Sequence, residues 1–385
     1  MWPDFSYILH SLIGTEPDNA FSVIKTFGFF LGIAFIASAS LLYIELKRKE
    51  GQNLITGMVE TVIVYKPIDW QDILTQAFIN FVIFYKIGYI VSHFESFKID
   101  PAAVIFSTKG NFTVGLVLFL VTAIYLFYKM SGETDKQIKT AEVFIHPHQR
   151  LTNITIVAAI YGLIGSKLFS VLENWNSFIK DPIGEFFSGS GLTIYGGLIL
   201  AFIMVYRYVA KRGIHPIHMM DAVAPSLMIG YCVGRMGCHF SGDGDWGIIN
   251  ELSKPNWFIF PDSWWANSYA HNVLNEGVKI PTCQWRYCSE LYPKVFPTPL
   301  YEIILAGIIT IILWLLRTKL HRAGLLFFVY CFLNGLERFF IEFIRVNPHY
   351  SIYGFDLSMA QFIALGLMLT GIAGFIFYWK KNIPA

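Results

Sequence analysis

The sequence predicts an all-α polytopic membrane protein, and its composition supports this fold class in three ways. Of the 385 residues, 55% are hydrophobic and only 15% are charged, unlike an ordinary water-soluble domain. The mean hydropathy is +0.50. The chain contains 35 Phe, 20 Tyr and 10 Trp, which suits lipid contact and interfacial aromatic belts. A net charge of +2 is too small to indicate a nucleic-acid partner. We expect residues 1–385 to form one integral membrane domain.

Windows of about twenty apolar residues predict about nine transmembrane helices. They cover residues 23–44, 71–93, 112–129, 151–172, 191–210, 219–239, 299–316, 324–345 and 357–379. The segment before the first helix, "MWPDFSYILHSLIGTEPDN", has no basic n-region and no small-residue cleavage site. We therefore do not expect it to be a removable signal peptide.

The positions of Lys and Arg predict the orientation of these helices. Cytoplasmic connections are enriched in both residues. With the N-terminus outside and the C-terminus in the cytoplasm, the inward connections hold most of them, including "KRKEG" after the first helix. The long connection 240–298 then lies outside. Its length and Trp content predict a partly folded head that receives a peptide substrate.

Polar residues from four predicted helices converge at the outer level. Arg235 lies near the outer end of its helix, and Tyr301 and Glu302 begin the next one. A spacing of four, four and three predicts one polar stripe along helix 324–345. The stripe consists of Asn334, Arg338, Glu342 and Arg345. The fourth contribution is "YGG" at 195–197, near the outer end of helix 191–210.

The number of arginines at this level indicates an anionic ligand. A single pair such as Arg338 and Glu342 has a structural alternative, because charges buried in a membrane must find partners in any case. Three arginines beside two glutamates favour a bound anion, and the planar guanidinium group suits phosphate. In the outer leaflet, that phosphate would belong to a phospholipid headgroup.

Several motifs occur in an order that carries a resemblance. Gly-Gly at 196–197 is followed by "DAVAPSLMIGYCVGRMGCHF", "PTPLYE", "ERFFIEFIR" and "SMAQ". This order resembles the bacterial prolipoprotein diacylglyceryl transferase family. The family transfers the diacylglyceryl group of phosphatidylglycerol to the lipobox cysteine thiol of a prolipoprotein, forming a thioether and releasing glycerol phosphate. The resemblance implies a transferase without a cofactor in the bacterial cytoplasmic (inner) membrane, with its active site facing the outer leaflet.

The resemblance also assigns site residues. Arg235 matches the arginine of the family's Gly-Arg-x-Gly-Asn-Phe signature, and Tyr301 and Glu302 match its Gln-Leu-Tyr-Glu element. The remaining matches are Arg338, Glu342 and Arg345 in Arg-x-x-x-Glu-x-x-Arg, and Gly196 and Gly197 in His-Gly-Gly. The glycines of "GRMG", Gly234 and Gly237, could equally serve helix packing.

The sequence departs from the family pattern at four places. Tyr195 stands where the family has the histidine of His-Gly-Gly, and Cys238 or His239 stands where the signature has Asn. Phe296 replaces a histidine. Helices 71–93 and 112–129 have no counterpart, so we expect residues 45–150 to be an inserted region whose two helices are not catalytic.

The chemistry of transfer assigns further roles. The phosphate that leaves needs fixed positive charge, and Arg235 and Arg338 are the candidate clamp, held by Glu302 and Glu342. A thiol must ionise before it attacks carbon, so a base is required. His239 is the first candidate for that base. His271 is the second, although a histidine in a loop is more commonly a solvated residue. We expect Tyr195 to be catalytic, and Asp243 and Asp245 to take part in substrate binding.

Alternatives remain for three features. Cys238, His239, Asp243 and Asp245 are possible metal ligands, but their spacing fits no established zinc or calcium pattern, so no metal is expected. Cys283 and Cys288 could form a disulfide in an oxidising compartment. The missing family histidine also allows a non-catalytic lipid-binding or transporter-like protein on the same scaffold.

Overall fold

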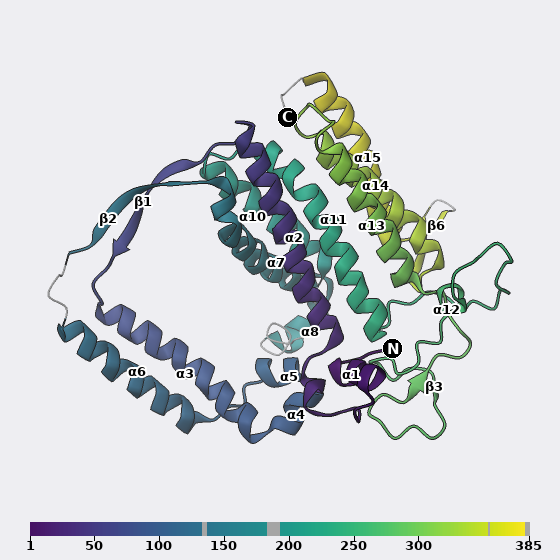
Figure 1. Cartoon of the computed structure of the whole chain (residues 1–385), viewed down its shortest axis with the longest axis horizontal. Helices are drawn as coiled ribbons and strands as arrows, with labels where there is room; N and C mark the ends of the chain where they lie inside the picture. The colour runs from purple at the N-terminus through teal and green to yellow at the C-terminus, as the bar shows by residue number, and fades with distance from the viewer. Residues whose placement is uncertain (133–136, 183–192, 353–354, 382–385) are drawn as a thin grey trace. The chain divides into compact units, whose positions relative to one another are not determined.

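The computed structural model describes residues 1–132, 137–182, 193–352 and 355–381, and most of them are helical (Figure 1). The chain divides into two compact units. The first contains residues 1–56, 147–155 and 206–385, and the second contains residues 57–146 and 156–205. The proposed phosphate site belongs entirely to the first unit.

Seven helices in the described part of the chain are long and apolar enough to cross a membrane. They are α2 (Thr26–Gly51), α3 (Trp70–Ser92), α6 (Phe112–Gly132), α7 (Leu151–Glu173, preceded by η2, Pro147–Arg150), α11 (Pro216–Ser241), α13 (Thr298–Leu316) and α15 (Met359–Lys381). The polytopic helical class is confirmed. The other two predicted spans correspond to α10 (Ile194–Lys211) and the 17-residue α14 (Leu325–Ile341). The count of nine and the orientation stay predictions.

The prediction of one helix over 324–345 is wrong at its C-terminal end. Helix α14 stops at Ile341, the single turn η3 (Glu342–Ile344) follows, and Arg345 has extended backbone with φ −91° and ψ 155°. The sequence Asn347-Pro348 comes next, and a proline forces the preceding residue out of helical geometry. The chain then forms a hairpin of β5 (His349–Ile352) and β6 (Phe355–Ser358) before α15.

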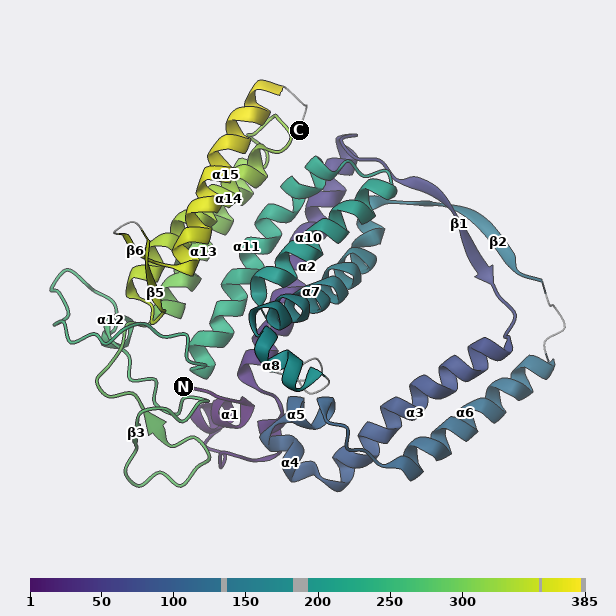
Figure 2. The ribbon, with the colours of Figure 1, turned by 180° about the vertical axis from the view of Figure 1, so that it is seen from behind.

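The helices of the first unit pack around α11, which contacts α2, α13 and α14, while α14 lies along α15 (Figure 2). Met228 and Cys232 of α11 share a core with Ala306 and Leu313 of α13. Small residues bring α11 close to α2, because a Cβ atom on Gly230 would collide with the Ser38 side chain. Close approach through small residues is typical of helix packing in membranes.

Buried acidic residues near the C-terminal end of α2 and the N-terminal end of α11 have partners within the first unit. Glu45 of α2 is fully buried and pairs with Arg48 and, at 3.0 Å, with Arg317 beyond α13. Asp221 of α11 accepts hydrogen bonds from the backbone N–H groups of Gly324 and Phe327, at 2.7 and 3.0 Å. A carboxylate at this place accepts hydrogen bonds from N–H groups that have no partner within α14. Its negative charge also interacts favourably with the positive N-terminal end of the helix dipole.

Helix α11 ends at a glycine that redirects the chain into the head. Gly242 has φ +65° and donates its N–H to the Cys238 carbonyl at 3.1 Å. A residue with a Cβ would be strained by roughly 1–2 kcal/mol in this left-handed conformation. The turn carries Asp243 and Asp245 back over the end of the helix.

The connection after α11 is folded around a small core of Trp246, Tyr269, Leu291 and Val295. It contains α12 (Asp262–Trp265) and a short pairing of β3 (Val278–Lys279) with β4 (Ser289–Glu290). Cys283 and Cys288 form a disulfide, with 5.6 Å between their Cα atoms. The N-terminal segment, with α1 (Phe5–Ile13) and η1 (Ala20–Val23), hydrogen-bonds to it, for example from the Tyr287 N–H to the Tyr7 hydroxyl at 3.2 Å.

The second unit contains a β-ribbon that the sequence analysis did not predict. Strand β1 (Met58–Tyr65) pairs antiparallel with β2 (Lys139–Ile145), and α3 and α6 lie side by side (Figures 1 and 2). The unit also includes α4 (Phe94–Ile99), α5 (Pro101–Phe106) and α8 (Trp175–Lys180). Asn80 of α3 donates to Thr122 of α6 at 2.9 Å, which joins the two helices within their apolar stretch.

Candidate active site

The site begins with Arg235, which lies on the last turns of α11. Its Nε atom pairs with Oε2 of Glu302 at 3.1 Å, and its Nη1 atom pairs with Asp245. The guanidinium carbon lies 5.3 Å from the ring centroid of Tyr231, one helical turn earlier. A cation over an aromatic face is stabilised electrostatically, so Tyr231 supports the charge of Arg235 as well as its position.

Glu302 is the centre of the cluster and has no exposed surface. Besides Arg235, its carboxylate receives Arg338 of α14 at 3.1 Å and Arg345 at 3.4 Å. The Tyr231 hydroxyl donates to the same Oε1 atom at 2.9 Å. One buried carboxylate therefore holds guanidinium groups from three separate segments, so the structure brings together the residues that the sequence placed at one depth.

Arg345 and Asp245 close the cluster on the side of the head. Their side chains pair at 2.6 Å, and the adjoining backbones are joined by the Ile248 N–H and the Ile344 carbonyl at 2.9 Å. Burial raises the pKa of Asp245, but Arg235 and Arg345 outweigh it and leave this pKa below its ordinary value. Asp245 therefore stays ionised beside the two arginines.

Glu342 links Arg338 to the start of the last helix. It is fully buried, pairs with Arg338 at 3.0 Å and accepts from the Ser358 hydroxyl at 2.8 Å. Ser358 and Gln361 form a reciprocal cap on α15: the Gln361 N–H donates to Ser358 Oγ at 3.2 Å, and the Ser358 N–H donates to Gln361 Oε1 at 2.9 Å. The "SMAQ" motif thus fixes Glu342.

The arginines keep part of their surface accessible. The side chains of Arg235, Arg338 and Arg345 are 15%, 22% and 11% exposed, whereas Glu302 and Glu342 are fully covered. A guanidinium group has five N–H donors, so these ion pairs leave donors for a ligand. Buried carboxylates hold the positive charges apart and in place, an arrangement suited to binding a phosphate group.

Cys238, Asp243 and Asp245 offer ligand atoms within 4.8 Å of one another. Burial raises the pKa of Asp243. Asp245 already pairs with Arg235 and Arg345, so a metal ion would have to compete with both. Donors of mixed hardness and bound guanidinium groups make this a weak metal centre, and the absence of a metal from the reaction stays a prediction.

The candidate bases occupy different surroundings. His239 is buried at the end of α11, and its Nδ1 atom lies 3.3 Å from the Tyr269 hydroxyl in the head core. His271 lies 2.6 Å from the Tyr287 carbonyl through Nδ1, a contact that holds the head backbone. The Tyr301 hydroxyl donates to the Trp264 carbonyl at 2.8 Å, which joins α13 to the head.

Tyr195, Gly196 and Gly197 belong to the second unit, at the start of α10. Both glycines face α7: Cβ atoms there would collide with Phe169 at Gly196 and with the Ser166 side chain at Gly197. The close approach of α10 to α7 thus requires a small residue at both positions. Their part in substrate binding and the catalytic part of Tyr195 stay predictions.

Two residues of the site, Tyr231 and Glu337, were not predicted from the sequence, and Ser358 was identified only as part of the "SMAQ" motif. Tyr231 lies four residues before Arg235, a spacing that places both on one helix face and was available as a signal. Ser358 with Gln361 has the spacing of a capping box. Glu337 is adjacent to Arg338 in the sequence, so it does not lie at the spacing of three or four residues by which the polar stripe was recognised.

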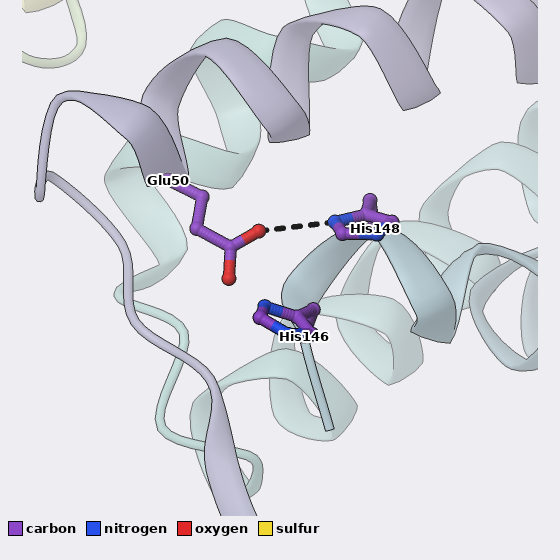
Figure 3. Close-up of side chains that lie close together, drawn as sticks. All are labelled: Glu50, His146 and His148. Atoms are coloured by element: carbon purple, nitrogen blue, oxygen red, sulfur yellow. Dashed lines mark hydrogen bonds and ion pairs between the residues drawn. The ribbon is translucent and has the colours of Figure 1, made fainter. Parts of the chain in front are cut away.

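A separate polar pair lies at the opposite end of α2. Glu50 and His148 hydrogen-bond with 3.0 Å between Oε2 and Nδ1 (Figure 3). Each side chain is 19% exposed. This pairing was not predicted from the sequence. It joins the C-terminal end of α2 to η2. Neither residue belongs to the arginine cluster.

Comparison with known proteins decides the family. The family model for prolipoprotein diacylglyceryl transferase matches residues 103–377. The chain belongs to this family. It is 29% identical over 294 residues to a phosphatidylglycerol–prolipoprotein diacylglyceryl transferase of Streptococcus sanguinis, covering 74% of this chain and 98% of that protein. It is also 29% identical over 246 residues to the transferase of the same name from Clostridium novyi, covering 64% and 84%. The family expected from the motifs is therefore confirmed.

Proposed function

We propose that this membrane protein transfers the diacylglyceryl group of phosphatidylglycerol to the lipobox cysteine of a prolipoprotein. The observation that carries the proposal is the arginine cluster around Glu302, which offers a phosphate three guanidinium groups from α11, α14 and the segment after η3. The curated relatives carry the name of this reaction, and the family match covers the whole cluster.

The cluster suits the phosphate of the lipid both before and during transfer. When the carbon–oxygen bond to the diacylglyceryl group breaks, the leaving glycerol phosphate gains negative charge. Arg235 and Arg338 face this charge as fixed donors, and a low-dielectric setting strengthens their effect. Glu302 and Glu342 keep both side chains in place, so little reorganisation is needed as the charge develops.

Asp245 is a carboxylate that the lipid phosphate can replace as the partner of the arginines. It pairs with both Arg235 and Arg345 and is itself 32% exposed, more than the other carboxylates of the cluster. A phosphate entering from the accessible side can take over donors now directed at Asp245, while Glu302 remains bound beneath. The arginines are thus kept paired in the resting state and available to the lipid.

The thiol substrate reaches the same place from the outer leaflet. The head, residues 240–298, lies directly above the arginine cluster through the Asp245–Arg345 pair and the bond from Tyr301 to Trp264. We assign to it the docking of the peptide substrate through the residues that follow the lipobox cysteine, while the signal peptide lies in the membrane. The inner membrane is the matching location, since lipids and exported prolipoproteins meet there. His239, predicted from the sequence to accept the thiol proton, remains a candidate for that role.

Complementation of a transferase-depleted bacterium tests the function. The wild-type gene should restore growth and lipidation of a labelled lipoprotein reporter, and Arg235→Lys should severely reduce the lipidation. Arg322→Lys provides a matched control, because Arg322 binds the Trp379 carbonyl at the other end of the helices. A stable, inserted wild-type protein that leaves the reporter unlipidated would refute the proposal and favour a lipid-binding protein without chemistry.

A further inference from the structure

Glu337 is a buried carboxyl group that the arginine clamp does not use. It lies on α14 and is 5% exposed, and neither carboxylate oxygen has a hydrogen-bond partner among the described residues. Its charged and titratable neighbours are Glu302, Arg338, Arg235 and Tyr231. Helix α15, packed along α14, carries no acidic or basic residue before Lys380. An unpaired ionisable group within a membrane span is costly to keep and commonly functional.

The charges of the cluster are balanced without Glu337. The three arginines pair with three carboxylates, those of Glu302, Glu342 and Asp245. Arg338, the nearest arginine along the chain, directs its guanidinium group at Glu302 and Glu342. Glu337 is therefore a fourth carboxyl group at the site, next to the Tyr231 hydroxyl and without an ion pair among the described residues.

Glu337 lies on the side of the cluster that faces away from the head. Tyr231, its neighbour on α11, is four residues before Arg235, about 6 Å further from the head along the helix. Arg345 and Asp245 lie on the head side, where residues 247 and 345 form a β-bridge. The site thus has a head side rich in arginine and a deeper side with Glu337 and Tyr231.

The groups of the lipid substrate follow the same order from the water into the membrane. In phosphatidylglycerol, the headgroup glycerol and the phosphate lie nearer the water, and the carbon under attack connects the phosphate to the acyl chains. With the phosphate on the arginines, that carbon points toward the deeper side. The attacking thiol has to approach it there, opposite the oxygen that leaves.

We propose that Glu337 is the catalytic base that accepts the proton of the acceptor thiol, an inference that rests on the proposed transferase function. The S–H bond breaks and its proton passes to a Glu337 oxygen. The sulfur electron pair forms the S–C bond, and the C–O bond to phosphate breaks with its electrons leaving on oxygen. The proton then passes from Glu337 to the glycerol phosphate, and the carboxylate is restored.

The test uses the purified full-length protein in nanodiscs of phosphatidylglycerol with a lipobox peptide, and compares wild type, Glu337→Gln and Glu142→Gln. Gln keeps the shape of Glu without its basicity, and Glu142 is an exposed residue of strand β2, outside the site and the head, that serves as the control. We expect Glu337→Gln to bind phosphatidylglycerol normally but to transfer about 100-fold more slowly at pH 7, the usual contribution of a general base. The defect should shrink as the pH approaches about 8.5, where thiols ionise unaided.

A selenocysteine peptide separates a base from a structural residue. A selenol is already ionised at neutral pH, so Glu337→Gln should transfer to it at nearly the wild-type rate. Failure of this rescue, or a Glu337→Gln enzyme with wild-type rate and pH profile on the thiol peptide, would overturn the assignment and leave the transferase function intact. A wild-type protein that transfers to neither peptide would overturn both. If Glu337→Gln does not fold, Glu337→Asp decides: it must keep the wild-type pH dependence at a reduced rate.

Discussion

Arg338 of α14 and Glu302 of α13 form an ion pair of 3.1 Å in which the glutamate is fully buried. Glu302 serves Arg235 and Arg345 in the same way, so the position of all three guanidinium groups depends on one carboxylate. A buried charge with several partners is costly to break, because each partner then lacks compensation. This relationship makes Glu302 the structural centre of the site.

Removing the charge of Glu302 should destabilise the protein and inactivate it. Glu302→Gln leaves three arginines with one fewer counter-charge, and loss of one partner from a buried ion pair costs about 3–5 kcal/mol. We expect a clearly lower Tm in detergent and transfer below detection, with Glu142→Gln of strand β2 unchanged. An unaltered Tm would show that the arginines do not depend on Glu302.

Arg235→Lys should leave the protein folded and reduce transfer by roughly 10- to 100-fold, about the worth of one or two charge-assisted hydrogen bonds. A lysine ammonium can reach one acceptor but cannot serve Glu302, Asp245 and a phosphate together as the planar guanidinium can. The rate of thioether formation measures this directly. Wild-type turnover in the Lys variant would remove Arg235 from the phosphate clamp.

Asp243 should lower the stability of the protein at neutral pH. Burial raises its folded-state pKa above the unfolded value of about 3.9, so the penalty for ionising it is present above the folded pKa and absent below the unfolded one. Asp243→Asn should therefore raise Tm by roughly 1–3 °C at pH 7, with the gain disappearing near pH 4. A lower Tm at pH 7 would instead show that the carboxylate has a stabilising partner.

Much of the arginine cluster could be predicted from the sequence, and the reason is geometric. Arg235, Glu302 and Arg338 each lie near one end of an apolar stretch, so membrane depth alone brings them to one level. The position of Arg345 in the cluster has a different structural cause. Its helix ends four residues earlier, and a turn with extended backbone directs the side chain to Asp245.

Other features depend on contacts between distant segments, which no local pattern encodes. The role of Asp245 depends on the turn at Gly242 and on the pairing of residues 247 and 345. Glu337 lies about 100° around α14 from Arg338, so the spacing that identified the polar stripe excluded it. The strands β1 and β2 had a local signal in "MVETVIVY" and "KTAEVFI", but their pairing joins segments about eighty residues apart along the chain.

Substitutions at Tyr195 test whether this residue takes the role of the family histidine. A tyrosine is a poor base at neutral pH, since its pKa is about 10, but a good hydrogen-bond donor to a phosphate or ester oxygen. We expect Tyr195→Phe to reduce transfer by about tenfold and Tyr195→His to retain most of it, measured as kcat/KM for the peptide. Equal activity of wild type and Tyr195→Phe would show that the hydroxyl has no part in the reaction.

His239→Ala separates the two candidate bases. If Glu337 accepts the proton, the pH–rate profile of His239→Ala should run parallel to that of wild type, with any loss arising from the missing contact with Tyr269. A loss confined to pH values below about 8 and relieved above would return the role of base to His239, as the sequence alone suggested.

The most direct test of the central claim is mass spectrometry of a lipobox peptide incubated with the purified protein and phosphatidylglycerol. The account predicts a peptide carrying one diacylglyceryl group on its cysteine, stoichiometric release of glycerol phosphate, and no adduct on a peptide with Ser in place of that cysteine. Absence of the adduct from a folded wild-type protein, with the lipid bound and unreacted, would contradict it.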